Sequence, residues 1–344
     1  MKKMKKLFAV LLTVVMMVSL VACGNNETTN ENMTTNETTE KIEIEEETVV
    51  EEMTYKIGIC QLVQHVALDA ATEGFEAALT EKLGDKVEFD VQNGQGDTAT
   101  CSTIINAFVS NEVDLIMANA TPALQAASSA TIDIPILGTS ITEYGTALDI
   151  PDFNGVTGRN ISGTSDLAPL DEQAAMVAEW FPDATNIGIL YCSAEANSAY
   201  QVAVIKTELE GLGYTVSEYS FVDSNDIATV TTKAAEESDA IYIPTDNTAA
   251  NNTSIIDNIC RPAGVPIIAG EAGICAGCGV ATLSISYYDI GYATGLMAYE
   301  ILVNGADVST MPIEYAPKFT KLYNATICED LGFTIPEGYE AISE

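Results

Sequence analysis

Four residues with hydrogen-bonding side chains follow a short apolar segment in the second half of the chain. Residues 240–243 have the length and composition of a buried strand, and the polar residues that come next are Thr245, Asp246, Asn247 and Thr248. In an open α/β sheet, small ligands bind beyond the carboxyl ends of the strands, where these side chains would lie. There Asp246 could meet an ammonium group, and the N–H groups of the following helix could meet a carboxylate. The alternative is that Asp246 and its neighbours only cap this helix.

The segments around this cluster predict strands and helices in alternation, from the period of their apolar residues. The predicted strands occupy residues 55–62, 87–91, 113–117, 134–137, 186–191, 215–221, 240–243, 265–268, 280–286 and 313–322. The predicted helices occupy residues 67–83, 98–110, 167–180, 198–212, 226–237, 247–260, 289–303 and 324–331, and one more begins at Pro122 with Thr121 as its N-cap. Alternating strands and helices imply an α/β fold with parallel sheets that helices cover on both faces.

The two halves of the chain resemble each other. Ile57-Gly58-Ile59 corresponds to Ile187-Gly188-Ile189, and residues 134–138 correspond to 265–270, at offsets of about 130 residues. A repeat of this size predicts two Rossmann-like lobes whose strand ends line one shared cleft.

The predicted lobes are built from separate parts of the chain. The N-terminal lobe is expected to comprise residues 54–160 and 284–316, and the C-terminal lobe residues 161–283 and 317–344. Three crossings between the lobes are expected, near Val156, Leu283 and Pro317.

The first residues predict a signal peptide. Four lysines precede an apolar run at residues 7–21, which is too short for a comfortable membrane span. The run ends in Leu20-Val21-Ala22-Cys23, which resembles a bacterial lipobox. This resemblance implies that residues 1–22 are removed and that Cys23 carries a lipid, whereas the alternative is a plain secretory signal. Residues 23–53, rich in Asn, Thr and Glu, are then an extended acidic tether.

Composition excludes several classes of function. The net charge of −36 opposes nucleic-acid binding, which needs a basic surface. The chain has one histidine, and it lacks a P-loop, a G-x-S-x-G motif and a Cys/His cluster of metal-site spacing. Cys192 follows a predicted strand, but no Cys/His/Asp set can be assigned around it. We therefore expect neither an enzyme nor a metal or cofactor.

The eight cysteines suggest a disulfide. If Cys23 is lipidated, seven remain, and an odd number leaves at least one unpaired within the chain. Cys275 and Cys278 form the only close pair, in a Gly-flanked segment that is predicted to be a loop. As a metal site or a redox motif this pair lacks the usual partners and helix. We expect Cys260 to be disulfide-bonded to Cys275 or to Cys278.

Several short segments, in the same order along the chain, resemble one family. They are Gln64-His65-Val66-Ala67-Leu68-Asp69, Gln92-Asn93-Gly94-Gln95-Gly96-Asp97, Ala120-Thr121-Pro122-Ala123, Glu195-Ala196-Asn197-Ser198, Pro244-Thr245-Asp246-Asn247-Thr248 and Tyr287-Tyr288-Asp289-Ile290-Gly291. The likeness is to the substrate-binding lipoproteins of ABC importers in the tryptophan/tyrosine-binding family, especially clostridial members. It extends from Tyr55 to about Pro336. The family commonly has Glu-His-Pro where this chain has Gln64-His65-Val66.

The resemblance implies a fold, a function and partners. The fold is that of type 1 periplasmic binding proteins, with the ligand in the cleft between the lobes. The function is to bind a free aromatic amino acid by hinge closure, for a permease in the membrane. The protein would be a monomer anchored by its lipid to the extracellular face of the cell membrane. The alternatives are a surface adhesin or interaction lipoprotein, and the same fold with a sugar or a branched amino acid.

A free amino acid presents an ammonium group and a carboxylate, and both need partners. Three acidic side chains are candidates for the ammonium, namely Asp246 first, then Glu143 and Glu195. Neither arginine clearly follows a strand end, so hydroxyl groups and helix N-termini are expected to hold the carboxylate. The candidates for this role are Thr121, Ser140, Asn197, Ser198 and Thr248.

An aromatic side chain needs flat apolar walls, and a phenol also needs a hydrogen-bond partner. Leu68, Tyr191 and Tyr287 are candidate walls, and Gln64 or His65 is the candidate partner of a phenol. Thr245 and Asn247 complete the predicted site. Tyrosine is favoured over tryptophan and phenylalanine because Gln64 and His65 are polar.

Overall fold

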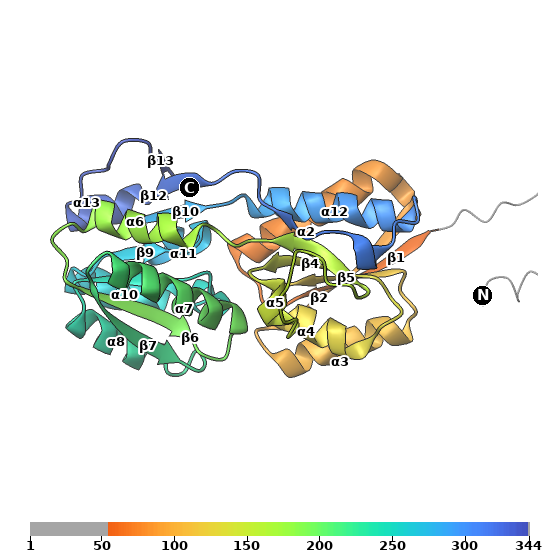
Figure 1. The fold of residues 1–344 in the computed structure, drawn as a ribbon, viewed down its shortest axis with the longest axis horizontal. Helices are drawn as coiled ribbons and strands as arrows, with labels where there is room; N and C mark the ends of the chain where they lie inside the picture. The colour runs from red at the N-terminus through yellow and green to blue at the C-terminus, as the bar shows by residue number, and fades with distance from the viewer. Residues whose placement is uncertain (1–53, 343–344) are drawn as a thin grey trace, which may run out of the picture. The chain divides into compact units, whose positions relative to one another are not determined.

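The structure is a computed structural model, and it describes residues 54–342 (Figure 1). The predicted signal peptide, the lipidation site Cys23 and the tether lie outside the described residues. Among the described residues, no helix has both the length and the apolar character that a membrane span requires.

The described chain forms two mainly parallel sheets, as the alternation of strands and helices predicts. The first sheet has the strand order β11-β5-β4-β3-β1-β2. Its strands are β1 (Tyr55–Gln61), β2 (Val87–Asn93), β3 (Leu115–Asn119), β4 (Ile136–Ile141), β5 (Ile161–Ser165) and β11 (Glu314–Tyr315). All the pairings within this sheet are parallel.

The second sheet has the strand order β13-β12-β10-β9-β8-β6-β7, with one antiparallel pairing, between β10 and β12. Its strands are β6 (Asn186–Cys192), β7 (Thr215–Phe221), β8 (Ala240–Ile243), β9 (Ile267–Ala269), β10 (Ala281–Ser284), β12 (Thr320–Tyr323) and β13 (Glu340–Ala341). The two sheets with their helices are the first and second lobes, and the predicted α/β fold class is confirmed.

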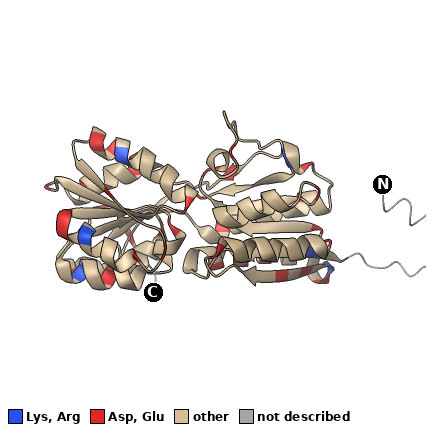
Figure 2. Cartoon of the chain, turned by 90° about the horizontal axis from the view of Figure 1, so that it is seen from below, with Lys and Arg blue, Asp and Glu red and all other residues tan. Residues whose placement is uncertain are grey.

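Helices cover both faces of each sheet (Figure 1). Those of the first lobe are α2 (Val66–Leu83), α3 (Thr98–Ser110), α4 (Thr121–Ala130), α5 (Tyr144–Ala147) and α12 (Tyr287–Leu302). Those of the second lobe are α6 (Leu170–Trp180), α7 (Ala196–Gly211), α8 (Ile227–Glu237), α9 (Asn247–Ala250), α10 (Thr253–Ala263), α11 (Ala272–Cys278) and α13 (Ala325–Leu331). Acidic residues outnumber lysine and arginine along the chain (Figure 2).

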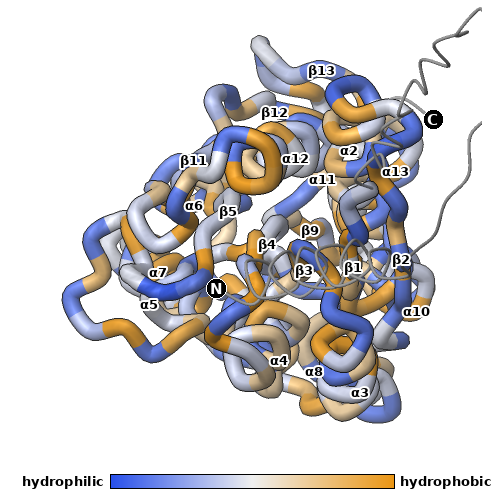
Figure 3. Tube along the Cα trace, turned by 90° about the vertical axis from the view of Figure 1, so that its right-hand side faces the viewer, coloured by the Kyte–Doolittle hydropathy of each residue, from blue (hydrophilic) through white to orange (hydrophobic). Residues whose placement is uncertain are grey.

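The central strands β1, β3 and β8 are mainly apolar in their middle residues because both of their faces are buried (Figure 3). On β1, Ile57 and Ile59 pack with Phe75 of α2 and Met297 of α12. The neighbouring Cys60 points to the opposite face and packs in the core that contains α3 and α4. The alternation of side chains along a strand therefore supplies two separate cores.

Helices α2 and α12 approach each other with almost no side chain between them. A Cβ atom added at Gly74 would lie 2.1 Å from the Tyr288 carbonyl oxygen. One added at Gly291 would lie 2.0 Å from the Ala71 carbonyl oxygen. Glycine is therefore required at both contacts, and this close packing fixes the start of α12 against the first sheet.

The first crossing lies later than predicted. Strand β5, Ile161–Ser165, pairs with β4 in the first sheet, so these residues do not belong to the C-terminal lobe. The sequence Ile-Ser-Gly-Thr-Ser lacks the apolar run that marks a buried strand. The structure buries its hydroxyl groups by hydrogen-bonding them, as Thr164 does with Thr139 and Thr294. The chain leaves the first sheet only after Ser165.

Three other predicted elements differ from the structure. Residues 313–322 are not one strand but two, β11 and β12, which lie in different sheets. The predicted helix at 247–260 is interrupted between α9 and α10. Thr121 is not the N-cap of α4: that position is Ala120, with a φ of 90°, and Thr121 is the first helical residue.

The expected disulfide is absent. All seven cysteines of the described residues are free and buried. Cys275 and Cys278 lie in helix α11 rather than in a loop. Their sulfur atoms contact the carbonyl oxygens of Gly279 and Ile274 within the same turn, and neither bonds to Cys260.

Candidate functional site

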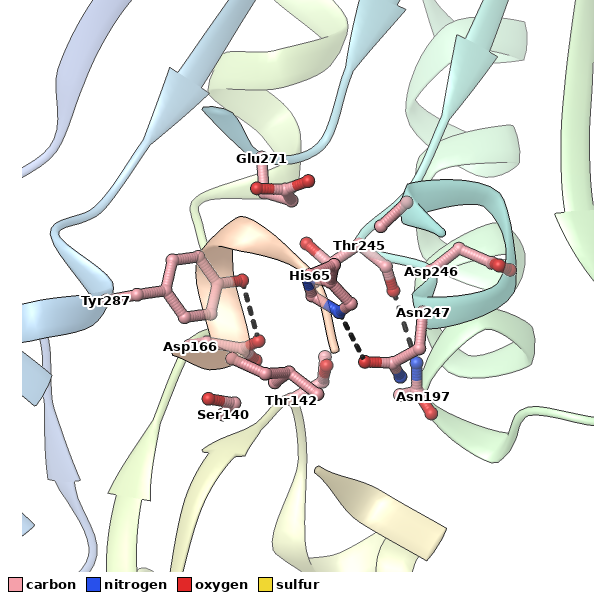
Figure 4. Close-up of a pocket in the computed structure, with 12 residues that line it drawn as sticks. His65, Ser140, Thr142, Asp166, Asn197, Thr245, Asp246, Asn247, Glu271 and Tyr287 are labelled. Carbon is pink, nitrogen blue, oxygen red and sulfur yellow. Dashed lines mark hydrogen bonds between the residues drawn. The ribbon is translucent and has the colours of Figure 1, made fainter. Parts of the chain in front are cut away.

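A cavity lies between the two lobes, at the carboxyl ends of strands from both sheets (Figure 4). The space between its lining side chains is about 280 Å³, including some that is open to solvent. The residues that line it are His65, Leu68, Ser140, Thr142, Asp166, Asn197, Thr245, Asp246, Asn247, Ala250, Glu271 and Tyr287. Neither lysine nor arginine is among them.

The strand ends explain how distant residues meet here. Asp166 directly follows β5, Glu271 lies two residues after β9, and Tyr287 begins α12 after β10. Ser140 is within β4 but has a φ of 57°, and the pairing register with β5 shifts at this point. An L-residue rarely adopts this φ, and such conformations concentrate at functional sites.

Four buried polar atoms of the lining residues have no hydrogen-bond partner. They are His65 Nδ1, Ser140 Oγ, Asp166 Oδ1 and Asn197 Oδ1. A buried polar atom without a partner costs about 1–3 kcal/mol. Their convergence on one cavity indicates a polar ligand that would satisfy them.

Asp166 and Tyr287 connect two of the three chain segments that pass between the lobes. The Tyr287 hydroxyl donates to Asp166 Oδ2 over 2.9 Å, and Oδ1 remains unpaired. Burial raises the pKa of Asp166 to about 6, against the opposing effect of the hydrogen bond from Tyr287. Asp166 is therefore ionised at neutral pH and presents an unpaired oxygen to the cavity.

Glu271 is the second acidic residue of the cavity, and it also caps a helix. Its two carboxylate oxygens accept hydrogen bonds from the backbone N–H groups of Gly273 and Ile274, at the start of α11. Burial raises its pKa, against the opposing effect of these N–H groups. Glu271 thus adds to the negative character of the cavity.

Asp246 lines the cavity and also caps a helix. Its Oδ1 accepts from the Ala249 N–H over 2.8 Å, as the N-cap of α9. Its Oδ2 accepts from the Cys192 N–H and the Ser198 hydroxyl, both over 2.7 Å. In Figure 4 this carboxylate points away from Asp166 and Tyr287. The protein itself therefore satisfies both oxygens, and the pairing of Asp246 with an ammonium group stays a prediction.

Glu195, another predicted partner of the ammonium, holds two helices together instead. It is buried and accepts hydrogen bonds from the backbone and side chain of Asn247 and of Thr248. It also accepts from Asn197 Nδ2 over 3.1 Å. Burial and, to a smaller extent, the negative charge of Glu195 raise the pKa of Asp246 to about 7. These two carboxylates form a buried acidic pair behind the cavity.

The structure brings eight of the predicted ligand-binding residues to the cavity: His65, Leu68, Ser140, Asn197, Thr245, Asp246, Asn247 and Tyr287. Six predicted residues have other surroundings: Gln64, Thr121, Glu143, Tyr191, Glu195 and Ser198. Gln64 lines a separate surface groove, and Tyr191 donates to Glu218. Glu143 caps α5, and Thr121 is buried at the start of α4.

Sequence reasoning missed Thr142, Asp166, Ala250 and Glu271. Asp166 follows the strand that the sequence did not reveal. Glu271 follows a predicted strand, so the rule that ligands lie beyond strand ends would have found it. Among the described residues there is no group of three or more His, Cys, Asp or Glu side chains that could hold a metal ion.

Comparisons with known proteins agree with one another. The family model described as ABC transporter substrate binding protein matches residues 56–342. The tyrosine-binding protein of Clostridioides difficile strain R20291 is 36% identical over 260 residues, which is 75% of each chain.

Two solved structures resemble the chain closely. The complex of an ABC domain with L-Trp from Streptococcus pneumonia has a TM-score of 0.80 and 32% identity, covering 84% of this chain and 100% of that one. The ligand-free, open structure of a substrate binding protein with adhesive properties from Clostridium difficile has a TM-score of 0.65 and 36% identity, covering 84% and 99%. The structure with the higher identity thus has the lower TM-score.

Proposed function

The chain belongs to the family of ABC transporter substrate binding proteins, and on that premise we propose that it binds a free aromatic amino acid. Tyrosine is favoured, before tryptophan and phenylalanine. The observation that carries the proposal is the unpaired, ionised Asp166 oxygen in a small cavity whose other unpaired atoms are polar. The relatives that are named for tyrosine or were solved with L-Trp support the aromatic class.

Asp166 is the proposed partner of the ligand's ammonium group. A hydrogen bond between two charged groups is about twice as strong as a neutral one, and the burial of Asp166 limits screening by water. Glu271 adds a second negative charge at the same cavity, and lysine and arginine are absent from its lining. This electrostatic environment favours a cation over a neutral or anionic group.

The ligand's carboxylate needs hydrogen-bond donors rather than a cation. Ser140 Oγ is buried, has no partner and lies at the distorted end of β4, where its hydroxyl is free to donate. Thr142 lines the cavity two residues further along. We assign the carboxylate to this end of the cavity, and the ring to the side bounded by His65, Leu68 and Tyr287.

Ligand binding would close the two lobes. Asp166 and Tyr287 lie on separate connections between the lobes, so a ligand bound to Asp166 contacts the hinge itself. The overall fold superposes better on the L-Trp complex, with a TM-score of 0.80, than on the ligand-free, open structure, with 0.65, although the open structure has the higher sequence identity. This comparison supports a closed arrangement here.

The proposed setting is the outer face of the cell membrane, with Cys23 as the lipid anchor and a permease as the partner. A relative described as having adhesive properties makes surface interaction a second candidate function. Deletion of the protein would then reduce cell attachment. Expression of a variant with impaired ligand binding, such as D166N, would restore it. Failure of D166N to restore attachment would count against an adhesive role that is separate from solute binding.

Calorimetry on the chain from residue 24 onward, refolded to remove carried ligand, tests the proposal. Tyrosine, tryptophan, phenylalanine and leucine are titrated in turn. We expect one-to-one binding of at least one aromatic amino acid and much weaker binding of leucine. The absence of binding to all three aromatic amino acids would refute the proposal.

A further inference from the structure

The only histidine of the chain joins the two lobes at the cavity. His65 precedes helix α2 of the first lobe, and its Nε2 lies 3.3 Å from Asn247 Oδ1 in the second lobe. The other ring nitrogen, Nδ1, is buried and has no partner within the protein. In Figure 4 the ring lies among Asp166, Glu271 and Asn247, next to the cavity. Which ring nitrogen carries the proton therefore decides whether Nδ1 is a hydrogen-bond donor or an acceptor for a ligand.

Glu195 fixes the orientation of the Asn247 amide. Asn247 Nδ2 donates to Glu195 Oε2 over 2.7 Å, and the Asn247 backbone N–H donates to the same oxygen over 3.1 Å. Since Glu195 Oε2 already accepts from the backbone N–H of Asn247, it is an acceptor at this contact, so the NH₂ group faces Glu195 and the amide oxygen faces His65. The amide oxygen is itself only an acceptor, and the hydrogen of this contact must therefore reside on His65 Nε2.

A neutral imidazole with its hydrogen on Nε2 has an acceptor lone pair at Nδ1. We propose that Glu195 and Asn247 hold His65 in this tautomer, and that Nδ1 accepts a hydrogen bond from a donor on the ligand's ring, the phenol O–H of tyrosine or the indole N–H of tryptophan. His65 is then a specificity-determining residue. This inference rests on the proposed function and names the feature of the ligand that the cavity selects.

The other unpaired atoms explain why the ring, rather than the ammonium group, supplies this donor. Asp166 Oδ1 carries negative charge and is the stronger partner for the ammonium. Asn197 Oδ1 is a further unpaired acceptor. Three of the four unpaired atoms are thus acceptors, and a ligand with donors at both ends satisfies them better than phenylalanine does. Phenylalanine would leave His65 Nδ1 buried and unpaired.

The presence of a single histidine allows a direct test by NMR. The tag-free chain from residue 24 onward, labelled with ¹⁵N in the histidine ring, gives one pair of ring nitrogen signals. We expect the pattern of a neutral ring protonated at Nε2. Tyrosine should shift the Nδ1 signal as expected for a newly accepted hydrogen bond, and phenylalanine should leave it nearly unchanged. A doubly protonated ring, the opposite tautomer, or equal shifts with both ligands would overturn the inference.

Affinities provide an independent readout. An unsatisfied buried acceptor should make phenylalanine bind about 10- to 100-fold more weakly than tyrosine to the unmodified protein. In His65→Leu the acceptor is gone, so this ratio should fall to within about threefold. Gln64→Leu is the matched control, because Gln64 is polar and adjacent in sequence but lines a different groove. It should preserve the ratio.

Two outcomes separate this inference from the function on which it rests. Equal affinity of the unmodified protein for tyrosine and phenylalanine overturns the role of His65 and leaves the proposed function standing. The role of His65 is also overturned, and the proposed function again stands, if His65→Leu keeps the full preference for tyrosine over phenylalanine. If none of the aromatic amino acids binds, the proposed function fails, and the inference fails with it.

Discussion

Replacing Asp166 by asparagine should weaken ligand binding and strengthen the ligand-free fold at the same time. The new amide would keep an acceptor for the Tyr287 hydroxyl, which donates to Asp166 Oδ2 over 2.9 Å. The variant therefore removes the negative charge with little change in shape. The charge has opposite effects in the two states, because it pairs with the ligand's ammonium in the complex and is unpaired without it.

The two magnitudes follow from burial. Removing one partner of a buried, hydrogen-bonded charge pair costs about 2–5 kcal/mol, so the Kd should rise about 30- to 4,000-fold. In the ligand-free protein, burial raises the pKa of Asp166 from an ordinary value of 3.8 to about 6. A shift of about two units means that the buried charge costs up to about 3 kcal/mol at neutral pH. D166N should therefore raise the free energy of unfolding by up to that amount.

Calorimetry with tyrosine and urea unfolding without ligand measure the two effects at pH 7.5. D246N is the matched control, since Asp246 is equally buried but its oxygens are occupied by Cys192, Ser198 and Ala249. It should alter stability and leave the Kd of the folded protein within a few-fold. The reasoning is refuted if D166N binds tyrosine as tightly as the unmodified protein. It is also refuted if affinity falls only together with a loss of stability.

Three further predictions concern pH and packing. Affinity for tyrosine should fall as the pH is lowered below about 6, because Asp166 then becomes protonated, and an equal Kd at pH 7.5 and pH 5 would contradict this. In the folded protein the pKa of Asp166 is about 6 and that of Asp246 about 7, and both exceed the ordinary value of 3.8. Each group therefore stabilises the fold fully below about pH 4. This contribution is lost as the pH rises through the folded-state pKa. D166N and D246N should each reduce this fall in the free energy of unfolding, measured in urea between pH 4.5 and 7.5. Gly291→Ala should lower the free energy of unfolding by about 1–3 kcal/mol or more, because the new methyl group would meet the Ala71 carbonyl oxygen. Gly211→Ala has open space around it, so its free energy of unfolding in the same assay should stay within about 1 kcal/mol of that of the unmodified protein.

The fold was largely predictable because its strands are apolar and its helices amphipathic. The strand at residues 215–221 and the helix at residues 98–110 have the bounds that the sequence predicts. Strand β5 was not predictable in this way, because its stability depends on hydroxyl groups that find partners only in the folded protein, such as Thr164 with Thr294. A period of apolar residues carries no information about such partners.

The site was partly predictable, because the strand ends of two parallel sheets must meet at one cleft. His65 and Tyr287 were identified through family motifs and lie at the cavity. Glu143 was identified through its charge alone and Glu195 through its charge within a family motif, and these two residues cap or connect helices. An acidic residue near a strand end has two possible partners, a ligand or a helix N-terminus. Its charge does not distinguish between them.

The distance to the next helix does distinguish between them. Asp246 is followed at once by α9 and turns back to cap it, and Glu271 does the same for α11. Asp166 is different, because α6 begins only at Leu170 and has Pro169 in the N-cap position. No hydrogen bond joins the Asp166 carboxylate to the first turn of α6; one oxygen accepts from Tyr287 and the other has no partner within the described chain. Among the acidic residues at the strand ends of this cleft, the one separated from its helix is therefore the one free to bind a ligand.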